Sequence, residues 1–323
     1  MMDNRGYLDV VKYYEVPELF YHLVKVMLTE DEIRLISLMK KNQFTYSGLI
    51  EFIHENFDRD SSLFLKNCYK RAVIKKIEKH KKTYYTTDTF YTRLSYFAQY
   101  ELDKWQGVAE DDRKKLDVWC FGTYVDKIRG TIEKKIRGKN IPLHNSDIIT
   151  LKKAQEMIDS MEKEIYLQPC NCRSIAQACD KPKNVCIQFG CENNTPADRG
   201  WGEQLTKEQA KQILKEANKQ GLIHSGEEEA LCNCDRCCCY PFRAAEILGS
   251  KKIWPKTEYV IQWDEASCIH CKKCIKICNF GAFYSLKENE VKFDREKCWA
   301  CTICAENCPK HAIAYYKATD VIL

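Results

Sequence analysis

The sequence is poor in the residues that nucleotide-binding enzymes use. It has only 13 glycines among 323 residues, and they are too scattered to form a phosphate loop or a G-x-G-x-x-G dinucleotide motif. No serine–histidine–acid constellation or flavin signature is present either, and no catalytic residue is predicted. These absences argue against an autonomous dehydrogenase.

Long apolar runs are also missing. Charged residues interrupt every apolar stretch near the start of the chain, and Asp9, Lys12 and Lys25 are examples. This pattern predicts neither a signal peptide nor a membrane-spanning helix, and no later segment is apolar enough to span a bilayer. We therefore expect a cytoplasmic protein with no membrane partner. In the reducing cytosol, abundant cysteines act as metal ligands or redox groups rather than as disulfides.

Cysteine is abundant, with 20 residues, and eight of them belong to an internal repeat. Each copy has the spacing C-x-x-C-x-x-C-x-x-x-C, the bacterial two-cluster pattern in which the fourth cysteine ligates the cluster of the other copy. The repeat therefore predicts two [4Fe–4S] clusters. The expected ligands are Cys268, Cys271, Cys274 and Cys308 for cluster 1, and Cys298, Cys301, Cys304 and Cys278 for cluster 2.

Zinc is the alternative for this repeat, because C-x-x-C pairs also build zinc sites. Three cysteines in tandem with a distant fourth, duplicated, fit iron–sulfur cubanes better. Asn279 stands where the pattern usually has proline, and we expect a slightly looser turn with every ligand kept. Trp299 is expected to shield cluster 2. Lys272, Lys273 and Lys276 either guide an acidic partner to cluster 1 or form an ordinary solvated face.

A second set of ten cysteines lies between residues 166 and 256, in two groups. They are Cys170, Cys172, Cys179, Cys186 and Cys191, followed by Cys232, Cys234, Cys237, Cys238 and Cys239. Adjacent side chains point in different directions, so the last three cannot all reach one small metal easily. The pattern predicts two sites or one large cluster, with all but Cys191 as candidate ligands. One further [4Fe–4S] cluster is the minimal interpretation; two clusters, a structural zinc site or a redox-active cysteine pair remain open. Cys68 and Cys120 are isolated and are expected to be buried thiols.

The first 145 residues carry all the excess positive charge of the chain. Thr29 and Glu32 form a capping box that opens a helix, and helical patterns follow over residues 46–54 and 61–71. Two β-rich segments at 73–77 and 83–87 come next, so the order predicts a winged helix-turn-helix. Further helices are expected at 90–105, at 113–127 and from Ser146 to about residue 164, and a strand-like piece at 165–167. A capping box at Thr206 opens another helix that ends at Gly221.

The middle region contains four short cysteine motifs. They are Pro169-Cys170-Asn-Cys172-Arg173, Cys179-Asp-Lys-Pro, Cys186-Ile-Gln-Phe-Gly190 and Cys232-Asn-Cys234-Asp-Arg-Cys237-Cys238-Cys239. These motifs resemble those of a family of 4Fe–4S ferredoxin-type proteins from anaerobes. The resemblance implies a winged-helix-like N-terminus, a cysteine-rich middle and a ferredoxin end. Family members often have another cysteine where Asp235 stands. The resemblance supports iron–sulfur binding in an anaerobic setting and names no substrate.

The sequence thus predicts an α+β protein with three domains. They are a winged-helix-like domain at 1–145, a cysteine-rich metal-binding domain at 146–256 and a two-cluster ferredoxin domain at 257–323. The predicted function is low-potential electron transfer with a redox partner protein, extended by the middle site. One alternative is a redox-sensing DNA-binding regulator, which is favoured by the eight basic and two acidic residues between Asp60 and Lys82. A second alternative is a reductase or activating protein with chemistry at the middle site.

Overall fold

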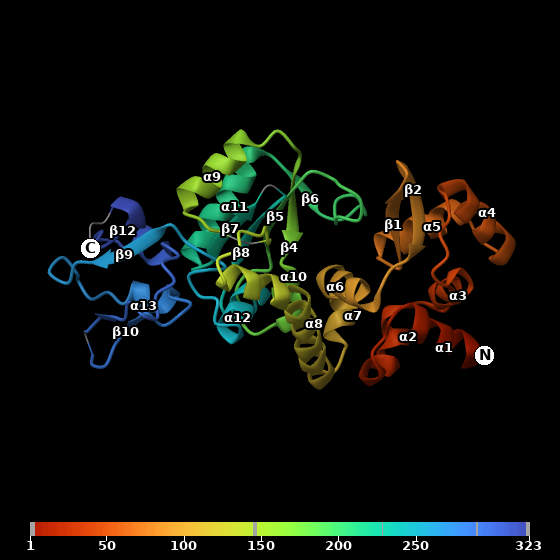
Figure 1. Cartoon of the computed structure of the whole chain (residues 1–323), viewed down its shortest axis with the longest axis horizontal. Coiled ribbons are helices and arrows are strands. Elements are labelled where there is room, and N and C mark those ends of the chain that lie inside the picture. Colours follow the sequence, from red (N-terminus) through yellow and green to blue (C-terminus); the bar gives the residue numbers. More distant parts are fainter. Residues whose placement is uncertain (1–3, 145–146, 228, 289, 321–323) are drawn as a thin grey trace. The chain divides into compact units, whose positions relative to one another are not determined.

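A computed structural model describes residues 4–144, 147–227, 229–288 and 290–320 (Figure 1). The chain has a mixed α+β fold and divides into two compact units. Unit 1 comprises Met1–Arg113 and Cys191–Gly202, and unit 2 comprises Lys114–Gly190 and Glu203–Leu323. The division into three domains drawn from the sequence stays a prediction. No helix in the described ranges has both the length and the apolar character needed to cross a membrane.

Unit 1 consists of short helices and one β-hairpin. Its elements are α1 (Asn4–Tyr13), the 3-10 helix η1 (Glu18–Leu23), α2 (Val24–Met27), α3 (Glu30–Met39), α4 (Tyr46–Asn56), α5 (Ser61–Lys70), β1 (Ile74–Lys79), β2 (Lys82–Thr87), α6 (Phe90–Tyr100) and α7 (Leu102–Gln106). Helix α8 (Glu110–Ile136) begins in unit 1 and continues into unit 2.

The predicted helices and hairpin between residues 29 and 87 are confirmed as elements. The Thr29 hydroxyl and the Glu32 carboxylate form the predicted capping box, and Thr45 and Asp60 cap α4 and α5. Strands β1 and β2 pair antiparallel from Ile74 opposite Thr87 to the turn. Three helices followed by a hairpin is the order expected of a winged helix, and that assignment stays a prediction.

Segment Cys191–Gly202 packs on the hairpin and α5 of unit 1, although it is distant in sequence. The Asn194 side chain accepts a hydrogen bond from the Lys76 backbone N–H (2.7 Å) and donates one to the Lys76 carbonyl (2.8 Å), as a neighbouring strand does. Trp201 donates to the Lys70 carbonyl (2.6 Å) and stacks on Tyr100. The segment therefore completes unit 1, and Cys191 lies in a different unit from the other middle cysteines.

Arg199 is the buried centre of this packing. Its guanidinium forms an ion pair with Asp88 at 2.8 Å, and both side chains are almost fully excluded from solvent. It also donates hydrogen bonds to the carbonyls of Tyr69 (2.6 Å) and Ile74 (2.8 Å). One side chain thus ties the segment to α5, β1 and the loop after β2.

Unit 2 is built on a six-stranded sheet in the order β3-β7-β8-β5-β4-β6, with all neighbouring pairs antiparallel. The elements are β3 (Asp147–Ile148), α9 (Leu151–Ser160), β4 (Ile165–Pro169), α10 (Asn171–Ala176), β5 (Asn184–Phe189), β6 (Glu203–Leu205), α11 (Lys207–Lys219), β7 (Ile223–Glu227), β8 (Ala230–Cys234) and α12 (Tyr240–Ile247). Helices α9 and α11 lie side by side on this sheet (Figure 1) and share a hydrophobic core with it.

The last part of unit 2 has the pseudo-symmetry of the sequence repeat. Strands β9 (Tyr259–Trp263) and β12 (Ile313–Lys317) pair antiparallel, as do β10 (Phe283–Tyr284) and β11 (Lys292–Phe293). Short helices α13 (Lys273–Ile277) and α14 (Ile303–Glu306) follow the first cysteines of each copy, and a 3-10 turn, η2 (Ala318–Asp320), ends the described chain. Each copy contributes one helix and one strand of each pair.

The structure corrects two predicted helices. The helix expected at 90–105 is divided at Glu101 into α6 and α7. The helix expected from Ser146 to about residue 164 is shorter, because Thr150 caps α9 and the helix ends at Ser160. Ser146 itself lies outside the described residues. Asp147 and Ile148 pair with Gly226 and Ser225 of β7, so a long-range strand contact replaces the first turn of the predicted helix. The strand predicted at 165–167 and the capped helix from Thr206 to Gly221 are confirmed as β4 and α11.

Replacing Arg199 with methionine is expected to destabilise unit 1. The substitution keeps much of the side-chain volume and leaves Asp88 buried without its cation, which typically costs about 3–5 kcal/mol. Chemical denaturation followed by tryptophan fluorescence measures the loss. Lys41→Met is the matched control, because the Lys41–Glu15 pair is solvent-exposed and its loss should cost about 0–1 kcal/mol. Equal free energies of unfolding for the two variants would contradict this role of Arg199.

Candidate metal centres

The eight cysteines of the repeat come together in two groups of four. One cavity is lined by Cys268, Cys271, Cys274 and Cys308, and a second by Cys278, Cys298, Cys301 and Cys304. Each group takes three cysteines from one copy of the repeat and the fourth from the other copy. This is the grouping that the crossed ligand pattern requires, and ligation of iron by these residues stays a prediction.

The two cysteine loops have the same backbone shape. Positive φ angles occur at His270 (53°) and Lys272 (60°) in the first copy, and at Ala300 (47°) and Thr302 (63°) in the second. This conformation turns the backbone N–H groups toward sulfur: the His270 N–H donates to Cys268 Sγ at 3.4 Å, and the Ala300 N–H donates to Cys298 Sγ at 3.2 Å. Donors of this kind stabilise the negative charge of ligated sulfur and tune the potential of a cluster.

Burial opposes the ionisation of several of these thiols. Desolvation raises the pKa of Cys274 to about 11, and it also raises the pKa of Cys301 and of Cys304. Ligation requires thiolates, so a metal centre must supply the positive charge that burial withholds. A set of four converging sulfurs with N–H donors fits a cubane cluster, which supplies a reversible one-electron couple.

Six of the middle cysteines form a second collection of sulfurs. Cys170 and Cys172 lie around the start of α10, Cys186 lies on β5, Cys232 and Cys234 lie on β8, and Cys239 caps α12. Since β4, β5 and β8 are neighbours in the sheet, residues far apart in sequence reach the same end of the sheet. Cys232 and Cys234 also share one face of β8, because side chains alternate along a strand.

The thiols of this six-cysteine group interact in series: Cys170 with Cys186, Cys186 with Cys232, Cys232 with Cys234, and Cys234 with Cys239. Burial, with the nearby Cys172 thiol, raises the pKa of Cys239 to about 12. Six sulfurs exceed the four ligands of a simple cubane. The group therefore has the donors for a large or unusual iron–sulfur centre, and its occupancy stays a prediction.

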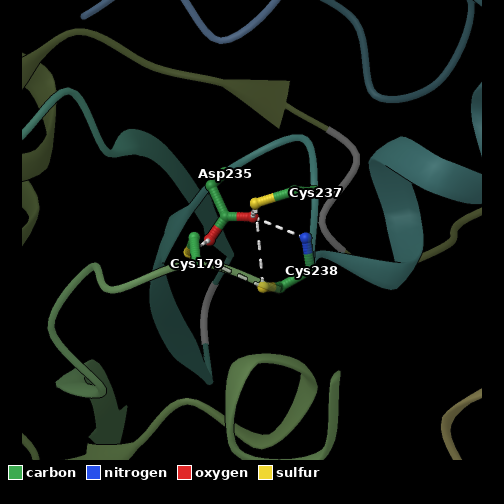
Figure 2. A group of neighbouring side chains, drawn as sticks. All are labelled: Cys179, Asp235, Cys237 and Cys238. Carbon is green, nitrogen blue, oxygen red and sulfur yellow. Dashed lines mark hydrogen bonds between the residues drawn. The ribbon is translucent and has the colours of Figure 1, made fainter. Parts of the chain in front are cut away.

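The remaining middle candidates lie apart from that group. Cys179, Cys237 and Cys238 surround the carboxylate of Asp235, and the four donor atoms all lie within 4.8 Å of one another (Figure 2). The structure thus divides the three consecutive cysteines, with Cys239 in the six-cysteine group and the other two around Asp235. Asp235 was not among the ligands predicted from the sequence. The position of Asp235 inside a run of cysteines is the one feature of the sequence that could have indicated it as a ligand.

A hydrophobic core joins the six-cysteine group to the second cavity of the repeat. Trp299 stacks on Phe280, with ring centroids 4.8 Å apart, and meets Phe242 edge-on at 5.3 Å. Cys234 and Cys239 belong to the same buried cluster, and the half-buried Cys301 packs against it. Trp299 also lines the second cavity, as expected for a shield over that site. The two cysteine collections therefore border one continuous core.

The repeat region matches a known domain. Residues 267–312 match the family described as a 4Fe-4S dicluster domain. The C-terminal region is therefore a ferredoxin-type iron–sulfur domain, which supports an electron-transfer role. No solved structure matches the chain.

Three curated relatives are similar to parts of this chain. The archaeal-type glutamate synthase [NADPH] of Thermotoga maritima is 35% identical over 71 residues, 22% of this chain and 14% of the relative. A subunit of the ion-translocating oxidoreductase complex of Methanosarcina acetivorans is 47% identical over 49 residues, 15% of this chain and 18% of the relative. Pyruvate synthase subunit PorD of Methanothermobacter marburgensis is 44% identical over 50 residues, 16% of this chain and 57% of the relative. The chain thus spans less than two thirds of each relative.

Asn279 has a role in the dicluster domain that the sequence did not reveal. Its side-chain amide donates to the Gly221 carbonyl (2.6 Å) and accepts from Lys181 (2.8 Å), so it links the domain to the turn after α11 and to the loop that contains Cys179. The equivalent residue of the second copy is Pro309. Asn279 therefore makes contacts that proline cannot make, and the prediction of a merely looser turn missed them. Cys68 and Cys120 are fully buried, as predicted.

Crossed ligation predicts which serine variants damage the same cluster. Cys308→Ser is expected to abolish the EPR signal that Cys268→Ser abolishes, and Cys278→Ser the signal that Cys298→Ser abolishes, since each pair lines one cavity. Anaerobic EPR of the reduced full-length variants measures this. Cys191→Ser is the control and should keep both signals, because Cys191 lies in unit 1. If Cys308→Ser instead abolished the EPR signal that Cys298→Ser abolishes, the crossed assignment would be refuted.

Proposed function

We propose that this chain is an iron–sulfur electron-transfer protein or redox subunit. Two [4Fe–4S] clusters in the dicluster domain exchange electrons with a partner protein, and a further centre held by the six-cysteine group extends the path. The observation that carries the proposal is the shared core of Trp299, Phe242 and Phe280, which both cysteine collections border. It excludes water between the two sites and keeps them at a fixed separation.

Polar contacts hold the same two parts of unit 2 together. Asn218, near the end of α11, donates to the Glu306 carboxylate and accepts from the Asn307 amide (2.7 Å). Glu306 also accepts from the Leu151 backbone N–H at the start of α9 (3.0 Å). Buried hydrogen bonds of this kind fix orientation, because each lost partner leaves a desolvated polar group. A rigid connection suits electron transfer, which depends steeply on distance.

The partner is expected to dock at the first cavity. Lys272, Lys273 and Lys310 line that cavity, and Lys276 is exposed on the same helix as Lys273. A basic surface next to a redox centre attracts an acidic partner and raises the association rate. Two of the relatives carry the word subunit in their names, which agrees with a protein that works beside a separate redox enzyme.

Metal and sulfide analysis tests the proposal directly. Anaerobically purified protein is expected to contain about eight irons for the dicluster domain alone and about twelve or more if the six-cysteine group holds a cluster. Serine substitution of Cys186 and Cys232 should remove only the irons beyond the eight of the dicluster domain. A preparation with eight irons that these substitutions leave unchanged would confine electron transfer to the dicluster domain. Fewer than eight irons, with no reducible cluster, would reject the function.

Charge reversal at the first cavity is expected to change reactivity according to the charge of the oxidant. In Lys273→Glu/Lys276→Glu/Lys310→Glu, reoxidation of the reduced protein by anionic ferricyanide should slow about tenfold at low salt, and reoxidation by cationic hexaamminecobalt(III) should accelerate. Stopped-flow absorbance measures both rates. The control Lys152→Glu/Lys153→Glu/Lys215→Glu makes the same charge change on exposed faces of α9 and α11. Equal effects of the two triple variants would show that the basic surface does not guide electron exchange.

A winged helix that binds DNA is the second candidate, and it rests on the exposed basic hairpin tip formed by Lys79, Lys81 and Lys82. Against it, Lys76 is paired with Asp198 at 2.6 Å and Lys70 lies over the Trp201 ring, so part of the basic surface is occupied within unit 1. An anaerobic gel shift with mixed genomic fragments tests it. A salt-sensitive shift that Lys79→Glu/Lys81→Glu/Lys82→Glu abolishes is the expected outcome for this candidate, and no shift in either redox state removes it.

A further inference from the structure

We propose that Cys179, Cys237, Cys238 and Asp235 form a separate site for one tetrahedral divalent metal ion, zinc by its donor set. The site differs from the six-cysteine group in ligand number and in the metal that it suits. It does not depend on the electron-transfer role proposed above. The middle region then holds two centres of different kinds.

The sulfur–sulfur distances fit a single ion. Cys179 Sγ lies 3.7 Å from Cys238 Sγ, and Cys237 Sγ lies 3.8 Å from Cys238 Sγ. Two thiolates bound to one zinc at about 2.3 Å in tetrahedral geometry are about 3.8 Å apart. Ligands of a cubane bind different irons and lie farther apart. The spacing therefore favours one ion over a cluster.

Asp235 completes the donor set. Its Oδ1 lies 3.1 Å from Cys237 Sγ, and its Oδ2 lies 3.8 Å from Cys179 Sγ. The side chain points into the space between the three sulfurs (Figure 2), so a metal ion there meets three sulfurs and one oxygen. Zinc accepts cysteine and carboxylate ligands in four-coordinate structural sites.

The surroundings hold this carboxylate in position and share its charge. Arg173, fully buried, contacts Asp235 Oδ2 through both Nε (2.7 Å) and Nη2. The Cys238 backbone N–H donates to Oδ1 at 2.6 Å. Partners that orient a ligand in this way are usual around metal sites. Three thiolates and a carboxylate carry four negative charges, which Arg173 alone cannot balance, and a divalent cation supplies most of the remainder.

The site joins two loops that no strand pairing connects. Cys179 lies in the loop after α10, and Cys237 and Cys238 lie in the turn between β8 and α12. Arg173 also donates to the carbonyl of Pro182 in the loop after α10 (2.7 Å) and to the carbonyl of Asn233 near the end of β8 (3.1 Å), so it links that loop to the strand that leads into the turn. A metal ion there adds to the Arg173–Asp235 pair in holding the turn between β8 and α12.

Metal analysis of the full-length protein, purified without oxygen and dialysed against a weak chelator, tests the site. We expect about one zinc per chain in the natural protein and in the Cys191→Ser control. Cys237→Ser and Cys179→Ser/Cys238→Ser should lose that zinc and keep their iron. Cys237 is exposed, so its substitution is the one least able to disturb folding.

Cobalt substitution gives a second readout that does not depend on how much zinc the host supplies. In the difference spectrum against the zinc form, Co²⁺ bound to the natural protein should show the intense visible bands of a tetrahedral thiolate site, and Cys237→Ser should lack or weaken them. Three results overturn the proposal. They are equal zinc in the natural protein and the variants, loss of iron rather than zinc from the variants, and a Cys179–Cys238 or Cys237–Cys238 disulfide in the anaerobic protein.

Discussion

The buried ion pair between Arg173 and Asp235 organises the cysteine-rich part of unit 2. Each charge is excluded from water, which is expensive unless every polar atom is matched by a partner. Arg173 meets that condition through the Pro182 and Asn233 carbonyls, and Asp235 through the Cys238 backbone. The pair therefore fixes the α10 loop against the turn after β8. Because Cys172 and Cys234 are the chain neighbours of these two residues, the pair also helps to place two sulfurs of the six-cysteine group.

The dicluster domain is joined to the rest of unit 2 by aromatic and polar contacts to α11, to α12 and to the turn after α11. Trp299 and Phe280 face Phe242 of α12, and Asn279 and Glu306 reach α11 and the turn that follows it. At Gly221 an added Cβ would lie 2.9 Å from the Ile277 carbonyl, and its φ of 76° favours glycine, so the close approach of the domain depends on this residue. Three of the repeat residues in these contacts, Ile277, Phe280 and Trp299, line the second cavity. None of these residues lines the first cavity, where we propose that the partner docks.

Unit 1, like unit 2, is held together by a few polar contacts between residues that are far apart in sequence. Segment Cys191–Gly202 separates β5 from β6 in the chain, yet its Asn194 and Arg199 hydrogen-bond to the backbone of α5 and β1. The segment pairs Lys76 with Asp198 and covers Lys70 with Trp201. Part of the basic charge of α5 and the hairpin is therefore paired or covered within unit 1. Charge counting alone does not reveal these contacts, because Asp198 and Trp201 are distant from the hairpin in sequence.

The sequence by itself determined what depends on local spacing. The two capping boxes at Thr29 and Thr206 and the hairpin after α5 follow from residues that are close together in sequence. The grouping of eight cysteines follows from the duplicated cysteine spacing of the repeat. The middle sheet did not follow, because its strands are short and cysteine and asparagine occupy the positions that usually reveal a strand. Strand order decided which of the nine middle candidates meet: β4, β5 and β8 bring six together, and the Arg173–Asp235 pair sets three apart. Only the tertiary structure could separate the six-cysteine group from the three cysteines around Asp235. Both groups come from the same two stretches of sequence, and they differ only in the direction in which each side chain points.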